Sequence, residues 1–147
     1  MLEEEVSDEA QPFETLRLRW SGVPGVLEVA LHRPHKSNAV SQAMWCELRA
    51  CFSKYCPALP DLRCVVLTGG LDCKNFCAGL DLGEVQPIAG TDVARTALQL
   101  RRHIADLQAS LDAIEALAVP VIAAVHGACY GAGLDMVCAC DVRWTCN

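Results

Sequence analysis

Short apolar runs alternate along this chain with longer segments whose apolar residues recur at helical spacing. Two of these runs, residues 62–68 and 120–125, are almost wholly apolar, and a glycine-bearing turn follows each. Such runs are typical of parallel strands that are covered on both faces, and parallel strands need long crossovers that usually contain a helix. The alternation therefore predicts an α/β fold with parallel crossovers.

The amino-terminal part predicts a β-hairpin followed by a helix. Apolar and polar residues alternate over 13–20 and again over 26–31, about a turn that contains glycine and proline. After a polar loop, apolar residues recur at helical spacing and stop before Pro57. Ser37 or Asn38 is expected to cap this helix at its amino end.

The longest helix is predicted from Thr91 or Asp92 to about Leu117, and Pro120 prevents its continuation. Its apolar residues form one stripe along the helix, which indicates a single buried face. The members of this stripe are Val93, Ala97, Leu100, Ile104, Leu107, Leu111, Ile114 and Leu117.

A long loop, roughly residues 69–91, precedes this helix and contains several glycines and prolines. Loops of that length inside a compact domain are more often functional than not. Beyond the strand at 120–125, a short helix is expected from about Gly133 and a last apolar strand over 141–145.

Length and charge restrict the class of protein. The 147 residues fit one domain, predicted over 13–147, after a flexible acidic lead-in over 1–12. The hydrophobic share of 52% excludes a disordered chain, yet no apolar run approaches the roughly 18 residues of a membrane span. The formal net charge of −6 disfavours nucleic acid as a partner.

Ten cysteines raise the question of disulfides or zinc. No two of them form a C-x-x-C pair, so a zinc site is not expected, and no metal site is predicted. Several lie among apolar residues, as in the segments that begin at Cys64 and Met136, which is typical of buried reduced thiols. We therefore expect a reducing compartment. We do not expect the acidic amino terminus to act as a targeting signal.

Two segments suggest chemistry because each places glycine after a buried strand. They are residues 76–82, Phe-Cys-Ala-Gly-Leu-Asp-Leu, and residues 126–135, His-Gly-Ala-Cys-Tyr-Gly-Ala-Gly-Leu-Asp. Glycine permits backbone conformations in which N–H groups converge on one point, and two such donors can form an oxyanion hole. Either segment alone is more often an ordinary tight turn than a functional site. Neither contains the spacing of a phosphate-binding loop.

These segments, together with His-Arg-Pro-His-Lys-Ser-Asn-Ala-Val at 32–40 and Cys-Asp-Val-Arg at 140–143, resemble the successive motifs of the crotonase (enoyl-CoA hydratase/isomerase) superfamily. The resemblance extends from Phe13 onward. Within the superfamily the chain is most similar to the Δ3,5-Δ2,4-dienoyl-CoA isomerase branch, on residues 92–95 and on Asp135, where hydratases carry glutamate.

The resemblance implies a crotonase-type repeated ββα spiral core, here a partial domain that is truncated before the carboxyl-terminal helices. It implies that the backbone N–H groups of Leu80 and Ala132 hold the thioester oxygen and that Asp135 is an acidic active-site residue in a dry acyl pocket. Substrate-binding positions follow by the same resemblance: His35, Lys36, Ala39, Val40, Ala78, Gly79, Leu80, Asp81, Leu82, Gly131 and Ala132. Among other polar residues, His126 is expected to be structural and Asp81 to shape its loop.

The activity implied is isomerisation of 3,5-dienoyl-CoA to 2,4-dienoyl-CoA in fatty-acid β-oxidation, through a dienolate that the oxyanion hole stabilises. The resemblance implies no cofactor, because coenzyme A is part of the substrate, and a homo-oligomer, trimer or hexamer, for the full fold. It also implies a mitochondrial or peroxisomal location. Two alternatives stay open: an enoyl-CoA hydratase or Δ3-Δ2-enoyl-CoA isomerase, and a non-catalytic acyl-CoA-binding subunit.

In the resembled isomerases, the glutamate and aspartate thought to move the proton lie beyond the position that corresponds to Asn147. The carboxyl-terminal helices that cover the acyl pocket lie there too. We therefore expect the 147-residue form to be catalytically weak or inactive.

Overall fold

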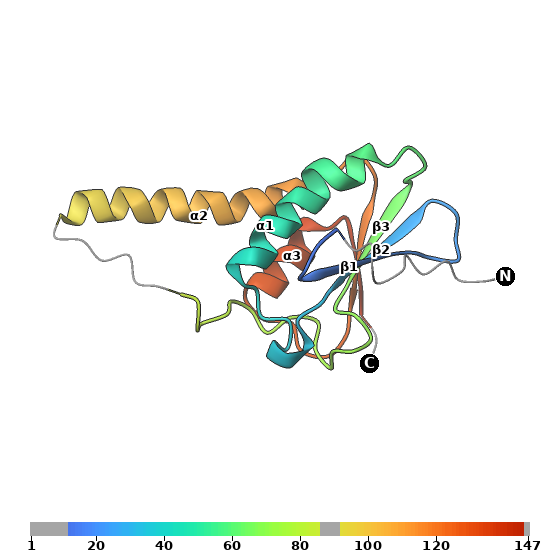
Figure 1. Cartoon of the computed structure of the whole chain (residues 1–147), viewed down its shortest axis with the longest axis horizontal. Helices are drawn as coiled ribbons and strands as arrows, with labels where there is room; N and C mark the ends of the chain where they lie inside the picture. Colours follow the sequence, from blue (N-terminus) through green and yellow to red (C-terminus); the bar gives the residue numbers. More distant parts are fainter. Residues whose placement is uncertain (1–11, 86–91, 146–147) are drawn as a thin grey trace.

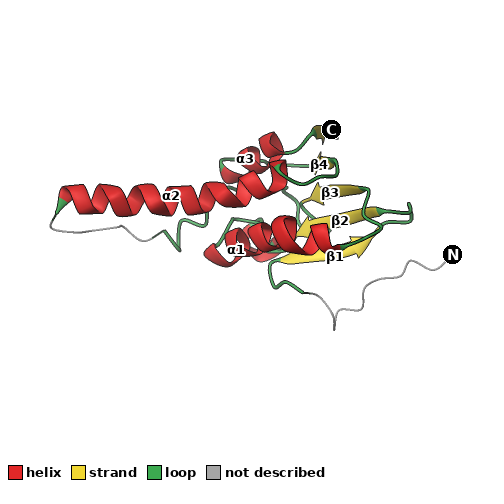
Figure 2. Ribbon diagram, turned by 90° about the horizontal axis from the view of Figure 1, so that it is seen from above, coloured by secondary structure: helices red, strands yellow, loops and turns green. Residues whose placement is uncertain are grey.

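The computed structural model describes residues 12–85 and 92–145. The predicted acidic lead-in, apart from Pro12, and the end of the predicted long loop lie outside these residues. Within them, a five-stranded sheet runs in the order β1-β2-β3-β4-β5, so each new strand is added beside the one before (Figure 2). β1 and β2 are antiparallel, and every later neighbour is parallel. The predicted α/β fold with parallel crossovers is confirmed.

The predicted hairpin is formed by β1 (Leu16–Trp20) and β2 (Val26–Leu31). The three later strands are β3 (Cys64–Thr68), β4 (Val121–Val125) and β5 (Val142–Thr145). All five lie where the sequence predicts a strand, because each is short, apolar and bounded by turn-forming residues.

Buried residues pair with buried residues across the sheet. Leu18 pairs with Val29, Val29 with Leu67, and Leu67 with Ala123, and each of these side chains is at most 2% exposed. Since side chains alternate between the faces of a strand, this row defines one buried face. The intervening residues of β3 and β4 are half-buried, so the expectation that these strands are covered on both faces is wrong for the described residues. β5 is exposed along its whole length.

The first crossover is helical, but its start differs from the prediction. α1 covers Gln42–Ala50, and its amino-terminal cap is Ser41, whose hydroxyl accepts from the Met44 N–H at 3.2 Å. Ser37 and Asn38 are not the cap. Both have left-handed backbone, with φ of 50° and 55°, which turns the chain before the helix can begin.

The helix also ends differently. A three-residue 3₁₀ turn, η2, covers Pro34–Lys36 before α1, and beyond α1 the helical path widens into a π-helical turn, η3 (Cys51–Tyr55). A 3₁₀ turn, η4 (Cys56–Ala58), follows it. Pro57 stands at the start of η4, where a missing N–H is tolerated, so proline does not stop the helical path before this point.

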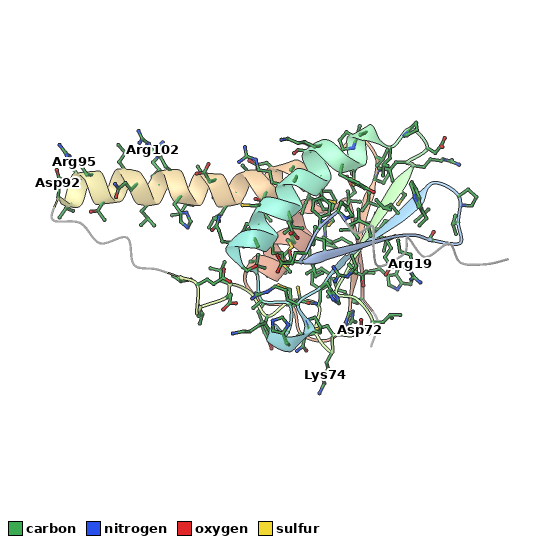
Figure 3. All side chains as sticks on the ribbon, in the orientation of Figure 1. Arg19, Asp72, Lys74, Asp92, Arg95 and Arg102 are labelled. Carbon is green, nitrogen blue, oxygen red and sulfur yellow. The ribbon has the colours of Figure 1, made fainter. Side chains whose placement is uncertain are left out.

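α2 (Val93–Glu115) is the predicted long helix, and the Asp92 carboxylate caps it by accepting from the Ala94 N–H at 2.9 Å. Its carboxyl-terminal half joins the core through Ser110, Ala113 and Ile114. Its amino-terminal half extends away from the sheet (Figure 1), and Figure 3 shows Asp92, Arg95 and Arg102 there. The predicted buried stripe is therefore buried over only half the helix, since Val93 is 82% and Ile104 44% exposed.

α3 (Ala132–Ala139) is the predicted short helix, and it connects β4 to β5. Buried side chains from all three helices join those of the strands in one cluster, which includes Met44, Leu48, Ile114 and Met136. In residues 12–85 and 92–145, no helix is long and apolar enough to cross a membrane.

Five of the nine cysteines in the described residues are buried, as predicted. They are Cys51, Cys56, Cys73, Cys77 and Cys140. Cys46 and Cys138 are exposed, and Cys64 and Cys129 are half-buried, so apolar sequence neighbours did not suffice to predict burial at those positions.

Candidate functional site

The two glycine segments that the sequence predicted to cooperate lie side by side. The Cys77 N–H donates to the Ala128 carbonyl at 3.1 Å, and the Tyr130 N–H donates to the Cys77 carbonyl at 3.0 Å. These two bonds pair Cys77 with Cys129 as in a parallel sheet. The two segments run in the same direction from this pair. Residues that lie the same number of positions beyond Cys77 and beyond Cys129 are therefore neighbours.

Gly79 and Gly131 are the neighbours two residues beyond this pair. Both have left-handed φ, 94° and 48°. A methyl group on Gly131 would lie 3.7 Å from the Cα of Gly79, and one on Gly79 would lie 3.3 Å from the Tyr130 carbonyl oxygen. The two backbones are therefore in van der Waals contact at glycine, immediately before Leu80 and Ala132.

The Leu80 amide points away from the strand-like segment that holds its loop. Val40 donates to the Gly79 carbonyl at 2.7 Å and accepts from the Asp81 N–H at 3.0 Å, which is the pattern of a parallel bridge between Val40 and Leu80. Val40 bonds to the residues on either side of Leu80, so in such a bridge the N–H and C=O of Leu80 itself point away from Val40. Within the described part of the chain, the Leu80 N–H donates no hydrogen bond.

Ala132 is the first residue of α3, so its N–H belongs to the first turn, where no intrahelical acceptor exists. The positive end of the helix dipole lies there. Ala132 is 4% exposed, and its φ is not in the left-handed region, so alanine fits this position without backbone strain. Its N–H also donates no hydrogen bond among the described residues.

A buried ion pair ties the first glycine segment to the loop at 32–40. Both terminal nitrogens of Arg33 lie 3.0 Å from the Asp81 carboxylate, and these side chains are 13% and 9% exposed. The hydrogen bonds from Arg33 hold the pKa of the Asp81 carboxyl below its ordinary value, although burial acts in the opposite direction. The Gly83 N–H also donates to this carboxylate, at 3.1 Å. The predicted loop-shaping contacts of Asp81 are present.

Asn38 is a positioning residue whose role the sequence reasoning missed, because the only role it expected for this side chain was that of a helix cap. Its fully buried side chain donates to the carbonyls of Gly69 and Phe76, at 2.8 and 3.1 Å, and accepts from the Arg33 N–H at 2.8 Å. Asparagine tolerates left-handed backbone better than most residues. A polar residue between a proline-bearing turn and an apolar run was the available signal.

Asp135 lies in the first turn of α3 and is exposed. The sequence analysis expected this carboxylate to face a dry acyl pocket, and among the described residues no such enclosure surrounds it. The physical reason is that α3 buries its opposite side, through Met136 and Val137, against the core.

The remaining predicted substrate-binding residues fall into two groups. Three of them are buried: Ala39, Val40 and Gly79. The others are exposed to solvent: His35, Lys36, Ala78, Leu82 and Gly131. Leu80 at 44%, Tyr130 at 66% and Leu134 at 53% exposure add apolar surface around the two glycine segments.

His126 follows β4, and its Nε2 lies 2.9 Å from the Cys73 carbonyl oxygen. The imidazole ring packs closely against Gly69, since a methyl group on that glycine would lie 2.8 Å from the ring. These contacts are those of the structural histidine that the sequence predicted. Across residues 12–85 and 92–145, no group of three or more His, Cys, Asp or Glu side chains could hold a metal ion.

Two hollows in the described residues lie elsewhere. One, of about 610 Å³, is lined by the sheet edge at Arg17–Arg19 and by Gly69–Cys73. The other, of about 540 Å³, lies between η4 and the end of α2. Neither is lined by Leu80, Ala132 or Asp135.

Comparison with known proteins places these motifs in a family. The enoyl-CoA hydratase/isomerase family matches residues 22–146. The mitochondrial Δ3,5-Δ2,4-dienoyl-CoA isomerase of Mus musculus is 42% identical over 145 residues, which are 96% of this chain and 42% of that protein. The peroxisomal Δ3,5-Δ2,4-dienoyl-CoA isomerase of Arabidopsis thaliana is 36% identical over 91% of this chain and 49% of its own length.

Solved structures agree on the fold. A protein described as a candidate enoyl-CoA hydratase from Thermobifida fusca YX, in complex with acetoacetyl-CoA, superposes with a TM-score of 0.70 at 31% identity. The match covers 89% of this chain and 50% of that one. The predicted crotonase-type core is confirmed, and the chain spans about half the length of the relatives it matches.

Proposed function

Because this chain belongs to the enoyl-CoA hydratase/isomerase family, we propose that it binds an acyl-CoA thioester and contributes to the isomerisation of 3,5-dienoyl-CoA to 2,4-dienoyl-CoA in fatty-acid β-oxidation. The observation that carries the proposal is the parallel pairing of the two glycine segments at Cys77 and Cys129. The similarity to proteins named dienoyl-CoA isomerases selects this substrate class.

The paired segments would act as an oxyanion hole. The Leu80 and Ala132 N–H groups follow two glycines that are in contact, and neither donates elsewhere in the described chain. Two donors aimed at one thioester oxygen stabilise the negative charge that develops when a proton leaves the adjacent carbon. Loss of one such donor costs roughly 2.7–4 kcal/mol of transition-state stabilisation in comparable enzymes.

The reaction itself is a proton shift along a conjugated system. A base removes a proton from the carbon beside the thioester carbonyl, the dienolate spreads its charge onto the carbonyl oxygen, and an acid returns a proton at the far end of the diene. Asp135 lies in the first turn of the helix that begins at Ala132, and we propose it as the carboxylate of this chain that takes part in the proton transfer. We propose no metal and no redox cofactor, because the balance requires only proton transfer.

Surrounding residues would hold the rest of the thioester. Ala78 through Leu82 and Gly131 would line the acyl group, with the exposed apolar side chains beside them. His35, Lys36, Ala39 and Val40 would lie near the pantetheine and nucleotide, where two exposed basic side chains suit phosphate. The organelle proposed is the mitochondrion or the peroxisome, since the relatives carry both names. A homo-oligomer is likewise a proposal.

Two other activities compete with this one. The likeness to a candidate enoyl-CoA hydratase favours a hydratase or Δ3-Δ2-enoyl-CoA isomerase. The exposure of Asp135 favours a subunit that binds acyl-CoA without turnover. Incubation of the 147-residue chain with 3,5-dienoyl-CoA and with 2-enoyl-CoA, followed by product analysis, separates all three.

The binding step is tested by calorimetric titration with acetoacetyl-CoA. Leu80→Pro removes the proposed donor, and we expect its affinity to fall at least tenfold. Leu80→Ala keeps the N–H while it removes the side chain, so it is the matched control and should bind within a few-fold of the parent. Equal affinity for Leu80→Pro and the parent, with both proteins folded by circular dichroism, would contradict the proposal.

A further inference from the structure

Two buried thiols meet where α1 ends, outside the paired glycine segments. The sulfur of Cys51 lies 3.9 Å from the sulfur of Cys56, and both residues are 0% exposed. Neither takes part in the proposed acyl-CoA chemistry.

The π-helical turn η3 is what brings these thiols together. In an α-helix, residues five apart point in directions about 140° different, since each turn takes 3.6 residues. In η3 the Cys56 N–H instead bonds to the Cys51 carbonyl, five residues back, and this wider turn places Cys56 over Cys51. Single π-turns inside helices are frequent at functional sites.

The contact makes the two thiols chemically unequal. When the Cys51 thiol donates to the Cys56 sulfur, the hydrogen bond lowers the pKa of Cys56 and raises the pKa of Cys51. Burial opposes the lowering of the pKa of Cys56 and reinforces the raising of the pKa of Cys51. Since the thiolate is the reactive form, Cys56 is the better nucleophile of the pair.

Cys56 also lies against a hollow, although the residue itself is 0% exposed, so an oxidant reaches its sulfur only when the side chains around it move. It lines the hollow of about 540 Å³ between η4 and α2, together with Phe52, Leu59, Ala113 and Leu117. These walls are mostly apolar, which suits a small uncharged oxidant better than a large anionic reagent.

We propose that Cys51 and Cys56 form an oxidisable dithiol site that a hydroperoxide closes to a disulfide. The Cys56 thiolate attacks the peroxide O–O bond and becomes a sulfenic acid, while the leaving oxygen takes a proton and departs as water or an alcohol. The Cys51 sulfur then attacks the sulfenic sulfur and forms the S–S bond, and the hydroxide that leaves takes up the Cys51 proton to give water. Two thiols are oxidised and one peroxide is reduced.

Peptide mapping of the intact 147-residue chain tests this proposal. Trypsin cleaves after Arg49, Lys54 and Arg63, which separates Cys51 and Cys56 into peptides 50–54 and 55–63, each with a single cysteine. After treatment with hydrogen peroxide and alkylation of the remaining thiols, we expect these two peptides to be recovered joined by a disulfide. Reduction with dithiothreitol should return both in alkylatable form.

Cys46 supplies the internal control, because it is exposed and is the single cysteine of peptide 37–49. Its oxidation proves that the peroxide was active. Recovery of peptides 50–54 and 55–63 unlinked, while Cys46 is oxidised, would overturn the proposal. The Cys51→Ser variant should leave Cys56 as a sulfenic or higher acid without a cross-link, whereas Cys46→Ser should leave the cross-link unchanged.

Discussion

Asn38 connects the loop at 32–40 to both ends of the loop that leads to the first glycine segment. Its amide group satisfies the carbonyls of Gly69 and Phe76 and the N–H of Arg33. Because the bonds to Gly69 and Phe76 are buried, no other partner could replace the amide there without a rearrangement.

Replacement of Asn38 by alanine should therefore destabilise the fold. Each buried backbone group left without a partner costs about 1–3 kcal/mol. We therefore expect the free energy of unfolding to fall by about that amount or more. Urea unfolding measures it. Ser37→Ala is the matched control, since Ser37 shares the left-handed backbone but contributes no side-chain bond among the described residues. Equal losses for both variants would mean that the amide contacts are energetically unimportant.

The Arg33–Asp81 pair predicts a dependence on pH. The folded chain lowers the pKa of Asp81 from its ordinary 3.8, so the ionised carboxylate stabilises the fold. This contribution is complete above the ordinary value and is lost as the pH falls from 3.8 toward the lower folded value. The destabilisation by Asp81→Asn should therefore be largest at neutral pH and shrink in acid.

Urea unfolding of the parent and of Asp81→Asn across this range measures the effect. Asp72→Asn replaces an exposed carboxylate and serves as the control. A difference between the parent and Asp81→Asn that does not change with pH would contradict the ion-pair explanation.

At the scale of elements, α2 is divided between a packed half and an exposed half. Ile114 is 1% exposed in the core, whereas Ile104, on the same predicted stripe, is 44% exposed. Helical periodicity indicates which side of a helix is apolar, but only the position of neighbouring elements determines how far along the helix that side is covered.

The same substitution at these two sites should give different results. Ile114→Ala should lower the free energy of unfolding by about 2–5 kcal/mol, because it leaves a cavity in the core. Ile104→Ala should change it by no more than about 0.5 kcal/mol, as surface substitutions do. Thermal unfolding followed by circular dichroism compares them. A large loss at Ile104 would show that the exposed half of α2 is covered in solution, for example by a second copy of the chain.

At the scale of the whole molecule, ligand binding and folding should be linked. The proposed thioester site consists of backbone held by β3, β4, α3 and the loop at 32–40, so it exists only when these parts are folded together. Acetoacetyl-CoA at about 100 times its dissociation constant should therefore raise the free energy of unfolding by about 2.7 kcal/mol.

Circular dichroism and tryptophan fluorescence should report the same increase in the free energy of unfolding. Trp45 is buried in the core, so its fluorescence changes when the core unfolds. At the same ligand concentration, Leu80→Pro should reduce the increase to about 1.4 kcal/mol or less, because its affinity is at least tenfold lower, without abolishing folding. An equal increase with free coenzyme A would show that the acyl group and its carbonyl contribute nothing to binding.

The sequence determined the elements of this protein through local physical chemistry. Alternating and continuous apolar runs predicted all five strands, and the Asp92 carboxylate predicted the start of α2, because side-chain periodicity and end-capping depend on residues close in the chain. The glycines at 79 and 131 likewise indicated positions where the backbone would turn.

Tertiary structure alone decided which of these features meet. The pairing of Cys77 with Cys129, the capture of Asp81 by Arg33 and the three bonds of Asn38 all join residues far apart in the sequence, so no local pattern could specify them. The exposure of Asp135 and of half of α2 depends on which neighbours lie against them. Local rules fix the shape of each segment, whereas burial and hydrogen-bond partners are properties of the packed chain.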